Sequence, residues 1–96
     1  MGIVILKPEA GEDLFGIWAY IAPDNPDVAQ AFIDLINEKF SLLAENPLIG
    51  TESDELAPAI RAFPDERYII FYRIINTGIE VIRVLHSARN INPNFF

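Results

Sequence analysis

The hydrophobic periodicity of the chain changes once, and this change restricts the fold more than any other feature. Between residues 8 and 45, apolar side chains recur at spacings of three and four, which is typical of amphipathic helices. Between residues 59 and 86, short runs rich in Ile, Val, Tyr and Phe are separated by turn residues, which is typical of strands. Helices followed by strands predict a two-layer α+β domain, with the helices on one side of a mostly antiparallel sheet.

Two helices are predicted in the first half of the chain. Pro8 and the acidic residues after it favour a helix start, and this helix should reach about Ala22. Asn25-Pro26 supplies a cap and a first-turn proline for a second helix, which should end near Glu45 before Asn46-Pro47. The short turn between them predicts an antiparallel helical hairpin. The apolar stripes expected to be buried are Leu14, Ile17, Trp18 and Ile21 in the first helix, and Ala29, Phe32, Ile33, Ile36, Phe40 and Leu43 in the second.

The strand signals complete the predicted order β-α-α-β-β-β. An apolar run over residues 3–6 ends at Lys7-Pro8 and is interpreted as an N-terminal strand, since it is far too short for a signal segment or a membrane span. A loop over residues 48–58 leads into a three-stranded antiparallel sheet. Its strands are expected at residues 59–63, 67–75 and 79–86. With 96 residues, the chain is expected to form a single domain spanning 1–96.

A three-residue turn, Asn76-Thr77-Gly78, is expected to join the last two strands. This turn would pair Ile75 with Ile79, Arg73 with Val81, and Phe71 with Arg83. The pleat then assigns two faces. One face should carry Arg67, Ile69, Phe71, Arg73, Val81, Arg83 and Leu85, and the helix-covered face Tyr68, Ile70, Tyr72, Ile74, Ile82, Val84 and His86.

Charge is segregated along the chain, and this points to the C-terminal sheet as a binding surface. The net charge is −7, yet five of the seven basic residues are arginines between residues 61 and 89. Like charges on one sheet face repel unless a partner's anionic groups, or carboxylates of the chain itself, offset them. Glu52, Asp54, Glu55, Asp65 or Glu66 could serve as internal partners, so both explanations stay open. The candidate partner-binding residues are Arg61, Phe71, Arg73, Arg83, Leu85, His86 and Arg89.

Arg83 is the arginine least easily explained as solvated, because it interrupts an apolar strand. In the expected register it lies opposite Phe71 and diagonal to Arg73, where its guanidinium could stack on the ring and bind an anion. We therefore expect Arg83 to serve partner binding rather than folding.

Several kinds of chemistry are poorly supported by the composition. His86 is the one histidine and the obvious acid-base candidate, although a structural role at a strand end is the alternative. Tyr68 and Tyr72 are expected to pack in the core with their hydroxyls at its rim. A lone histidine, no cysteine and dispersed glycines predict neither a metal site nor a cofactor cradle. The acidic balance argues against direct nucleic-acid binding, and the lack of cysteine suits the cytoplasm.

Several short motifs, taken in order, resemble toxins of the ParE/RelE superfamily, and specifically the ParE branch. The resemblance covers nearly the whole chain. One departure is Ser87, where the family usually has Gly. The matching motifs are Leu6-Lys7-Pro8-Glu9-Ala10, Asp13-Leu14, Ile17-Trp18-Ala19-Tyr20-Ile21-Ala22, Asn25-Pro26, Asn46-Pro47, Ile60-Arg61-Ala62-Phe63-Pro64, Tyr68-Ile69-Ile70-Phe71-Tyr72-Arg73 and Arg83-Val84-Leu85-His86-Ser87-Ala88-Arg89-Asn90.

This resemblance implies the toxin half of a type II toxin–antitoxin pair, held inactive by a cognate antitoxin. It also implies two candidate targets, because ParE-like toxins poison DNA gyrase whereas RelE-like toxins cleave mRNA on the ribosome. RNA cleavage requires an acid, a base and cations, and this chain offers one histidine and two lysines, both outside the C-terminal sheet. Inhibition of gyrase by binding, without enzymatic activity, is therefore favoured. The alternatives are a ribosome-dependent endoribonuclease and a non-toxic antitoxin-binding or regulatory module.

Overall fold

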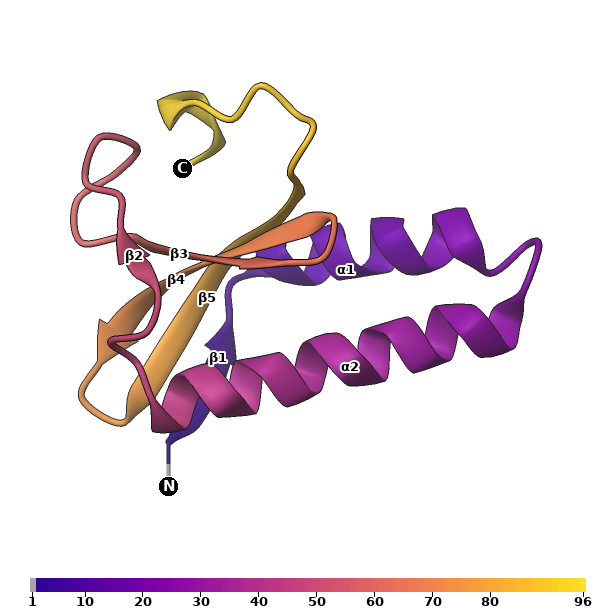
Figure 1. Cartoon of the computed structure of the whole chain (residues 1–96), viewed down its shortest axis with the longest axis horizontal. Helices are drawn as coiled ribbons and strands as arrows, with labels where there is room; N and C mark the ends of the chain where they lie inside the picture. The colour runs from indigo at the N-terminus through magenta and orange to yellow at the C-terminus, as the bar shows by residue number, and fades with distance from the viewer. Residues whose placement is uncertain (1) are drawn as a thin grey trace.

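The structure is a computed structural model that describes residues 2–96, and its two helices agree closely with the prediction. Helix α1 spans Pro8–Ile21 and helix α2 spans Pro26–Glu45. The Asn25 side chain caps α2, as predicted, by accepting a hydrogen bond of 3.1 Å from the Val28 amide. Figure 1 shows the two helices as an antiparallel hairpin on one side of the sheet.

The sheet has five strands in the order β1-β5-β4-β3-β2, so the predicted three-stranded sheet was too small. Strand β1 (Ile3–Leu6) joins it as a parallel neighbour of β5 (Gly78–His86). The antiparallel part contains β4 (Tyr68–Ile75), β3 (Arg61–Asp65) and the two-residue strand β2, Thr51–Glu52, which the sequence did not reveal. A short 3-10 helix, η1 (Pro93–Phe95), lies near the C-terminus.

The turn between β4 and β5 is shorter than predicted. Gly78 pairs with Ile75 and also with Ile3 of β1, so only Asn76 and Thr77 form the turn. A side chain at position 78 would overlap the Ile3 backbone, and Gly78 also has a φ of 153° that favours glycine. The predicted pairs of Ile75 with Ile79 and Arg73 with Val81 are therefore wrong, and Arg73 lies opposite Glu80.

A β-bulge restores the predicted register farther along this hairpin. Tyr72 pairs with Val81, and the next residue, Phe71, pairs with Arg83, as predicted. Ile82 lies between these two partners and is the extra residue of the bulge. The bulge reverses the alternation of β5. Val81 consequently faces the helices and Ile82 the opposite side, the reverse of the predicted assignment.

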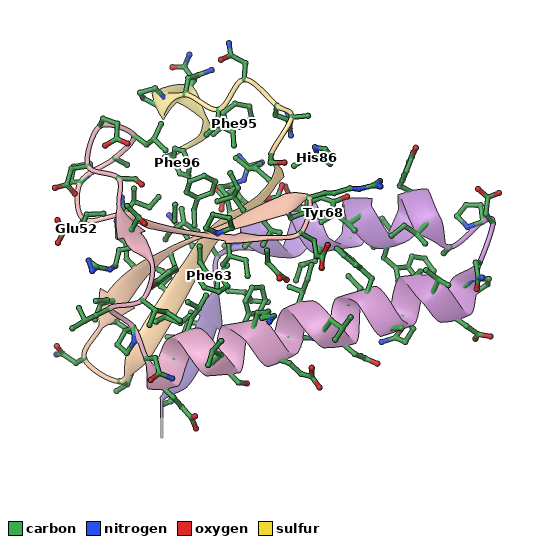
Figure 2. All side chains as sticks on the ribbon, viewed as in Figure 1. Glu52, Phe63, Tyr68, His86, Phe95 and Phe96 are labelled. Carbon is green, nitrogen blue, oxygen red and sulfur yellow. The ribbon has the colours of Figure 1, made fainter. Side chains whose placement is uncertain are left out.

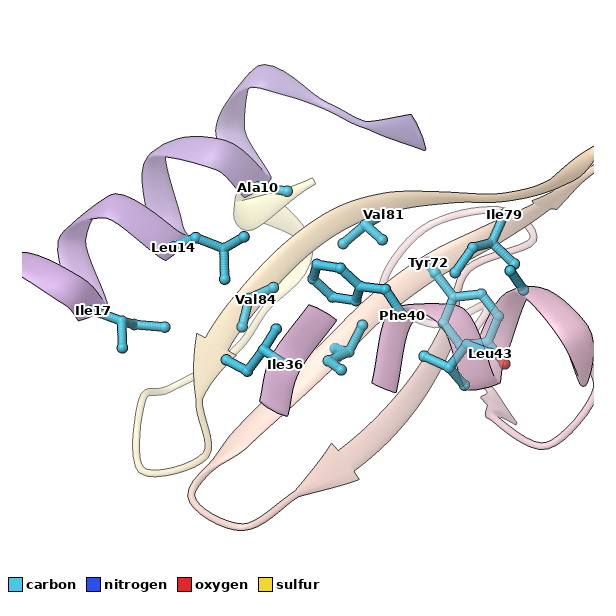
Figure 3. Packing of buried hydrophobic residues seen from close by; sticks show 12 residues of the cluster. Ala10, Leu14, Ile17, Ile36, Phe40, Leu43, Tyr72, Ile79, Val81 and Val84 are labelled. Atoms are coloured by element: carbon cyan, nitrogen blue, oxygen red, sulfur yellow. The ribbon is translucent and has the colours of Figure 1, made fainter. Parts of the chain in front are cut away.

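The larger core lies between the helical hairpin and the sheet (Figure 3). Phe40 and Leu43 of α2 pack there with Tyr72, Ile79 and Val84 of the sheet. The buried stripe of α1 is narrower than predicted, with Ala10, Leu14 and Ile17 in the core, whereas Trp18 is 38% exposed and stacks on exposed Phe15.

A smaller core lies on the other side of the sheet, which we call the helix-free face. Ile60, Phe71, Ile82 and Leu85 form its buried centre. Its cover comes from the loop before β3 and from the C-terminal segment, residues 87–96, which Figure 1 shows on the side of the sheet away from α2. The sheet is thus covered on both faces, by helices on one and by irregular chain on the other.

Candidate partner-binding face

The C-terminal segment is attached to the helix-free face mainly through its two aromatic residues. The Phe96 ring meets the Phe71 ring edge-on, with 4.9 Å between centroids. The guanidinium groups of Arg83 and Arg89 lie 5.6 Å and 4.7 Å from the centre of the Phe95 ring. Figure 2 shows Phe95 and Phe96 on this side of the sheet. Aromatic residues at the end of the chain therefore occupy part of the predicted binding face.

Arg83 forms an ion pair that sequence reasoning missed. Its Nε and Nη2 donate to the Asp13 carboxylate of α1 at 2.7 Å and 2.8 Å, and its Nη1 donates to the Phe95 carbonyl at 3.1 Å. Asp13 also accepts a hydrogen bond of 3.0 Å from the Val84 amide. Val84 lies in the part of β5 that follows the residues paired with β1. The hydrogen bonds to Asp13 raise the pKa of Arg83, so the guanidinium stays charged.

This geometry corrects the expected role of Arg83. Arg83 lies opposite Phe71 as predicted, but its guanidinium lies over the Phe95 ring and binds a carboxylate 70 residues away in the chain. The Arg83 and Asp13 side chains are 18% and 13% exposed, so either charge would be left largely buried without its partner. Arg83 thus has a structural function, whatever it contributes to binding.

Arg61, Arg73 and Tyr72 hold the loop between α2 and β3. Arg61 pairs with Glu52, one of the internal carboxylates considered above, at 3.3 Å, and its guanidinium also reaches the Leu48 carbonyl. Arg73 donates to the Pro58 carbonyl at 2.9 Å. The Tyr72 hydroxyl donates to the Pro47 carbonyl at 2.7 Å and accepts the Gly50 amide at 2.9 Å, which confirms a hydroxyl at the core rim.

His86 lies on the helix-covered side, as the strand alternation predicted. Its ring meets the Tyr68 ring edge-on at 5.1 Å, and Nδ1 accepts the Ala88 amide at 3.0 Å. Nδ1 is thus the acceptor nitrogen of this ring, and Nε2 is its donor. Burial, and then the neighbouring Tyr20, raise the pKa of Tyr68, while Arg67 partly opposes the shift.

The predicted partner-binding residues therefore do not form one cluster. Arg83 and Arg89 meet at Phe95, while Phe71 and Leu85 lie beneath this cover. Arg61 and Arg73 are bound to the preceding loop, and His86 belongs to the other face. The sequence analysis did not identify four contributors to this face: Asp13, Ile60, Ile82 and the Phe95-Phe96 pair. Of these, only the Phe95-Phe96 pair could have been noticed in the sequence, as two adjacent aromatic residues near the C-terminus.

An apolar trough remains open beside the C-terminal segment. It has a volume of about 340 Å³ and lies between β2, the following loop, β3 and β4. Leu56, Ala62, Ile69, Phe71 and Ile91 supply its apolar lining. Partner side chains could enter this trough without moving the C-terminal segment.

Among residues 2–96, no helix is long and apolar enough to cross a membrane, and no group of three or more His, Cys, Asp or Glu side chains could hold a metal ion.

The fold is that of toxins solved within toxin–antitoxin complexes. A chromosomal ParDE system from P. aeruginosa contains a chain that matches with a TM-score of 0.73 and 20% identity, covering 90% of this chain and 96% of that one. A chain of the RelBE2 toxin–antitoxin complex from Mycobacterium tuberculosis matches with a TM-score of 0.65 and 21% identity, covering 90% and 98%. At these identities the likeness concerns the fold.

Sequence comparison defines the family. The model of the ParE toxin of the type II toxin–antitoxin system parDE matches residues 4–91. Toxin ParE1 of Caulobacter vibrioides is 30% identical over an alignment of 87 residues that covers 88% of this chain and 88% of that protein. The chain belongs to the ParE toxin family and is the toxin component of a type II toxin–antitoxin system, as its motifs predicted.

Proposed function

We propose that this toxin inhibits DNA gyrase by binding and is neutralised by a cognate antitoxin that docks on the helix-free face. Membership of the ParE family supports the pairing with an antitoxin. The observation that carries the docking proposal is the apolar trough beside a sheet face whose cover is irregular chain. Apolar surface next to arginine is the composition enriched in the centres of protein interfaces.

The antitoxin segment that fits this face carries apolar side chains for the trough and carboxylates for the arginines. Arg89 is exposed, and Arg73 and Arg61 are partly accessible at the borders of the face. Phe71 contributes to the lining of the trough, whereas Leu85 becomes accessible only where the C-terminal segment moves aside. His86 lies on the opposite side of the sheet and can contact a partner that extends around its end.

Inhibition of gyrase by binding is favoured over RNA cleavage because the helix-free face lacks an acid–base pair. Its cations are arginines, most of which already hold carbonyl or carboxylate groups of the chain. The one histidine uses Nδ1 within its own turn. A ribonuclease needs groups that can exchange protons at the reacting phosphate, and permanently charged arginines cannot supply them.

The docking surface is tested by placing a charge in the trough. Ala62→Asp introduces a carboxylate that loses hydration when apolar side chains enter, so antitoxin affinity should fall about tenfold or more. Ala31→Asp, on the exposed surface of α2, is the matched control and should bind normally. Affinity is measured by titration with the small protein that co-purifies with the toxin from its native cells. Equal affinity of both variants would place the antitoxin elsewhere.

The target is tested separately, with gyrase, supercoiled plasmid and ATP. The purified toxin should accumulate linear DNA, and a stoichiometric amount of antitoxin should suppress that product. Cleavage of mRNA on translating ribosomes, without any effect on gyrase, would overturn the choice of target. A chain that is always recovered alone and is harmless when overexpressed would overturn the pairing as well.

A further inference from the structure

A second concave surface lies on the helix-covered side of the sheet, on the side away from the apolar trough. Tyr20 and Ile21 of α1, Phe32 of α2, Arg67, Tyr68 of β4 and His86 of β5 line a crevice of about 550 Å³. We call it the hairpin crevice, because it opens between the two helices and the adjoining ends of β4 and β5. Its volume lies within the range of small-molecule sites, roughly 300–1,000 Å³.

The lining of the hairpin crevice is rich in aromatic rings. Tyr68 is central, with its ring 5.3 Å from that of Phe32 and 5.1 Å from that of His86. Figure 2 shows Tyr68 and His86 together at one end of the sheet. The Tyr20 side chain is 83% exposed and stands at the border. A planar ligand could therefore contact ring faces that the core leaves uncovered.

The hairpin crevice is also cationic, which is unusual in a chain with 14 acidic and 7 basic residues. Its lining includes one permanent cation, Arg67, and no carboxylate. Within residues 2–96, the Arg67 guanidinium forms no ion pair, in contrast to Arg61 and Arg83. It lies close enough to Tyr68 to lower the pKa of that hydroxyl against the effect of burial. Glu12 and Asp13 line the neighbouring hollow, where Arg83 neutralises Asp13. Asp65 pairs with Tyr68 in the sheet and Glu66 precedes Arg67, so carboxylates flank the crevice without lining it.

We propose that the hairpin crevice binds a small planar aromatic anion, with its ring on Tyr68 and Tyr20 and its anionic group on Arg67. The planar fork of arginine suits both phosphate and carboxylate. The ligand is accordingly a nucleoside monophosphate or an aromatic carboxylate, which share this chemistry. His86 can add a donor through Nε2, since Nδ1 is occupied by Ala88. The proposal does not depend on the gyrase assignment.

The test follows the NMR signals of the tyrosine rings and of the His86 imidazole in the full-length protein. Four probes are titrated to millimolar concentration: AMP, indole-3-acetate, adenosine and inorganic phosphate. We expect saturable shifts at Tyr20, Tyr68 and His86 with AMP or indole-3-acetate, and the probe that binds more tightly is used with the variants. Adenosine lacks the anionic group and phosphate lacks the aromatic ring. The affinity of each should therefore be lower by about tenfold or more.

Variants distinguish specific binding in the hairpin crevice from nonspecific electrostatic attraction of the anionic probe. Arg67→Ala should weaken the stronger probe by about tenfold or more, whereas Lys39→Ala, which removes the same charge from α2 outside the crevice, should not. Tyr20→Ala changes an exposed ring and should weaken binding by about fivefold while leaving the fold intact. Absence of saturable shifts with both anionic rings would overturn the proposal. So would equal weakening by Arg67→Ala and Lys39→Ala.

Discussion

The two faces of the sheet are covered in different ways, although each buries a phenylalanine almost completely. Phe40 on the helix-covered side and Phe71 on the helix-free face are both 2% exposed. Phe40 is enclosed by regular helices and strands, whose backbone groups bond to one another. Phe71 is enclosed partly by the Phe96 ring, which is held by side-chain packing, and partly by the loop before β3, whose few backbone bonds include the one from the Ser53 amide to the Ile60 carbonyl. Equal burial therefore does not imply equal rigidity.

This difference separates the part of the chain that maintains the fold from the part available to a partner. A cover made of irregular chain can open with little loss of backbone hydrogen bonding, whereas a helix cannot. Arg83 connects the two regions, because it binds Asp13 of α1 and the Phe95 carbonyl at once. The following variants test how independent the two faces are.

The largest effect is expected in the helix-covered core. Phe40→Ala should lower the free energy of unfolding by about 3–5 kcal/mol, because regular elements around it cannot collapse into the cavity. Phe71→Ala should cost about 2 kcal/mol, since the irregular cover can settle into the space. Urea denaturation with matched m values measures both. Equal losses would show that the two covers are equally rigid.

Arg83→Ala should have the next largest effect, about 2–3 kcal/mol, because it leaves the Asp13 carboxylate largely buried without its partner. This reverses the expectation from sequence that Arg83 is dispensable for folding. The double variant Arg83→Met with Asp13→Leu should recover much of the loss, since it removes both charges. Thermal unfolding of the single and double variants gives the coupling energy. No coupling would mean that the pair is solvated in solution.

Phe96→Ala should cost about 1 kcal/mol, because Phe96 is only partly buried and its loss leaves the sheet intact. Phe15→Ala is a suitable control, since Phe15 is 68% exposed. Hydrogen exchange should show faster exchange in residues 87–96 and unchanged protection in α2. A global loss of protection would contradict the view of this segment as a separable cover.

The smallest effect concerns pH. Burial raises the pKa of Tyr68 above its value in the unfolded chain, so the unfolded state loses its proton first. The resulting stability is fully present below about pH 10 and is lost as pH rises beyond it. Tyr68→Phe should reduce the dependence of stability on alkaline pH, and Tyr20→Phe should reduce it less, because it removes only the smaller of the two causes that raise the pKa of Tyr68. Identical alkaline unfolding of the wild type and Tyr68→Phe would exclude this contribution.

The sequence by itself determined the helices and the existence of the β4–β5 hairpin. Pro8, the Asn25-Pro26 cap and Asn46-Pro47 are local signals, and they act within a few residues of the boundaries that they set. The apolar stripe of α2 was also readable, because helical spacing brings its residues to one side of the helix in any environment. The family motifs were also readable, because each consists of a few neighbouring residues and the motifs follow one another in a fixed order along the chain. They were sufficient to identify the toxin class.

Only the tertiary structure decided the register near the turn, the attachment of Arg83 and the cover of the helix-free face. The parallel pairing of β1 with β5 draws Gly78 into the sheet and shortens the turn, and the bulge at Ile82 then restores the pairing of Phe71 with Arg83. Asp13 and Arg83 are 70 residues apart, and Phe71 and Phe96 also meet only after folding. These contacts join segments that are far apart in the sequence. A local sequence pattern does not specify which distant residue will contact a given side chain after folding.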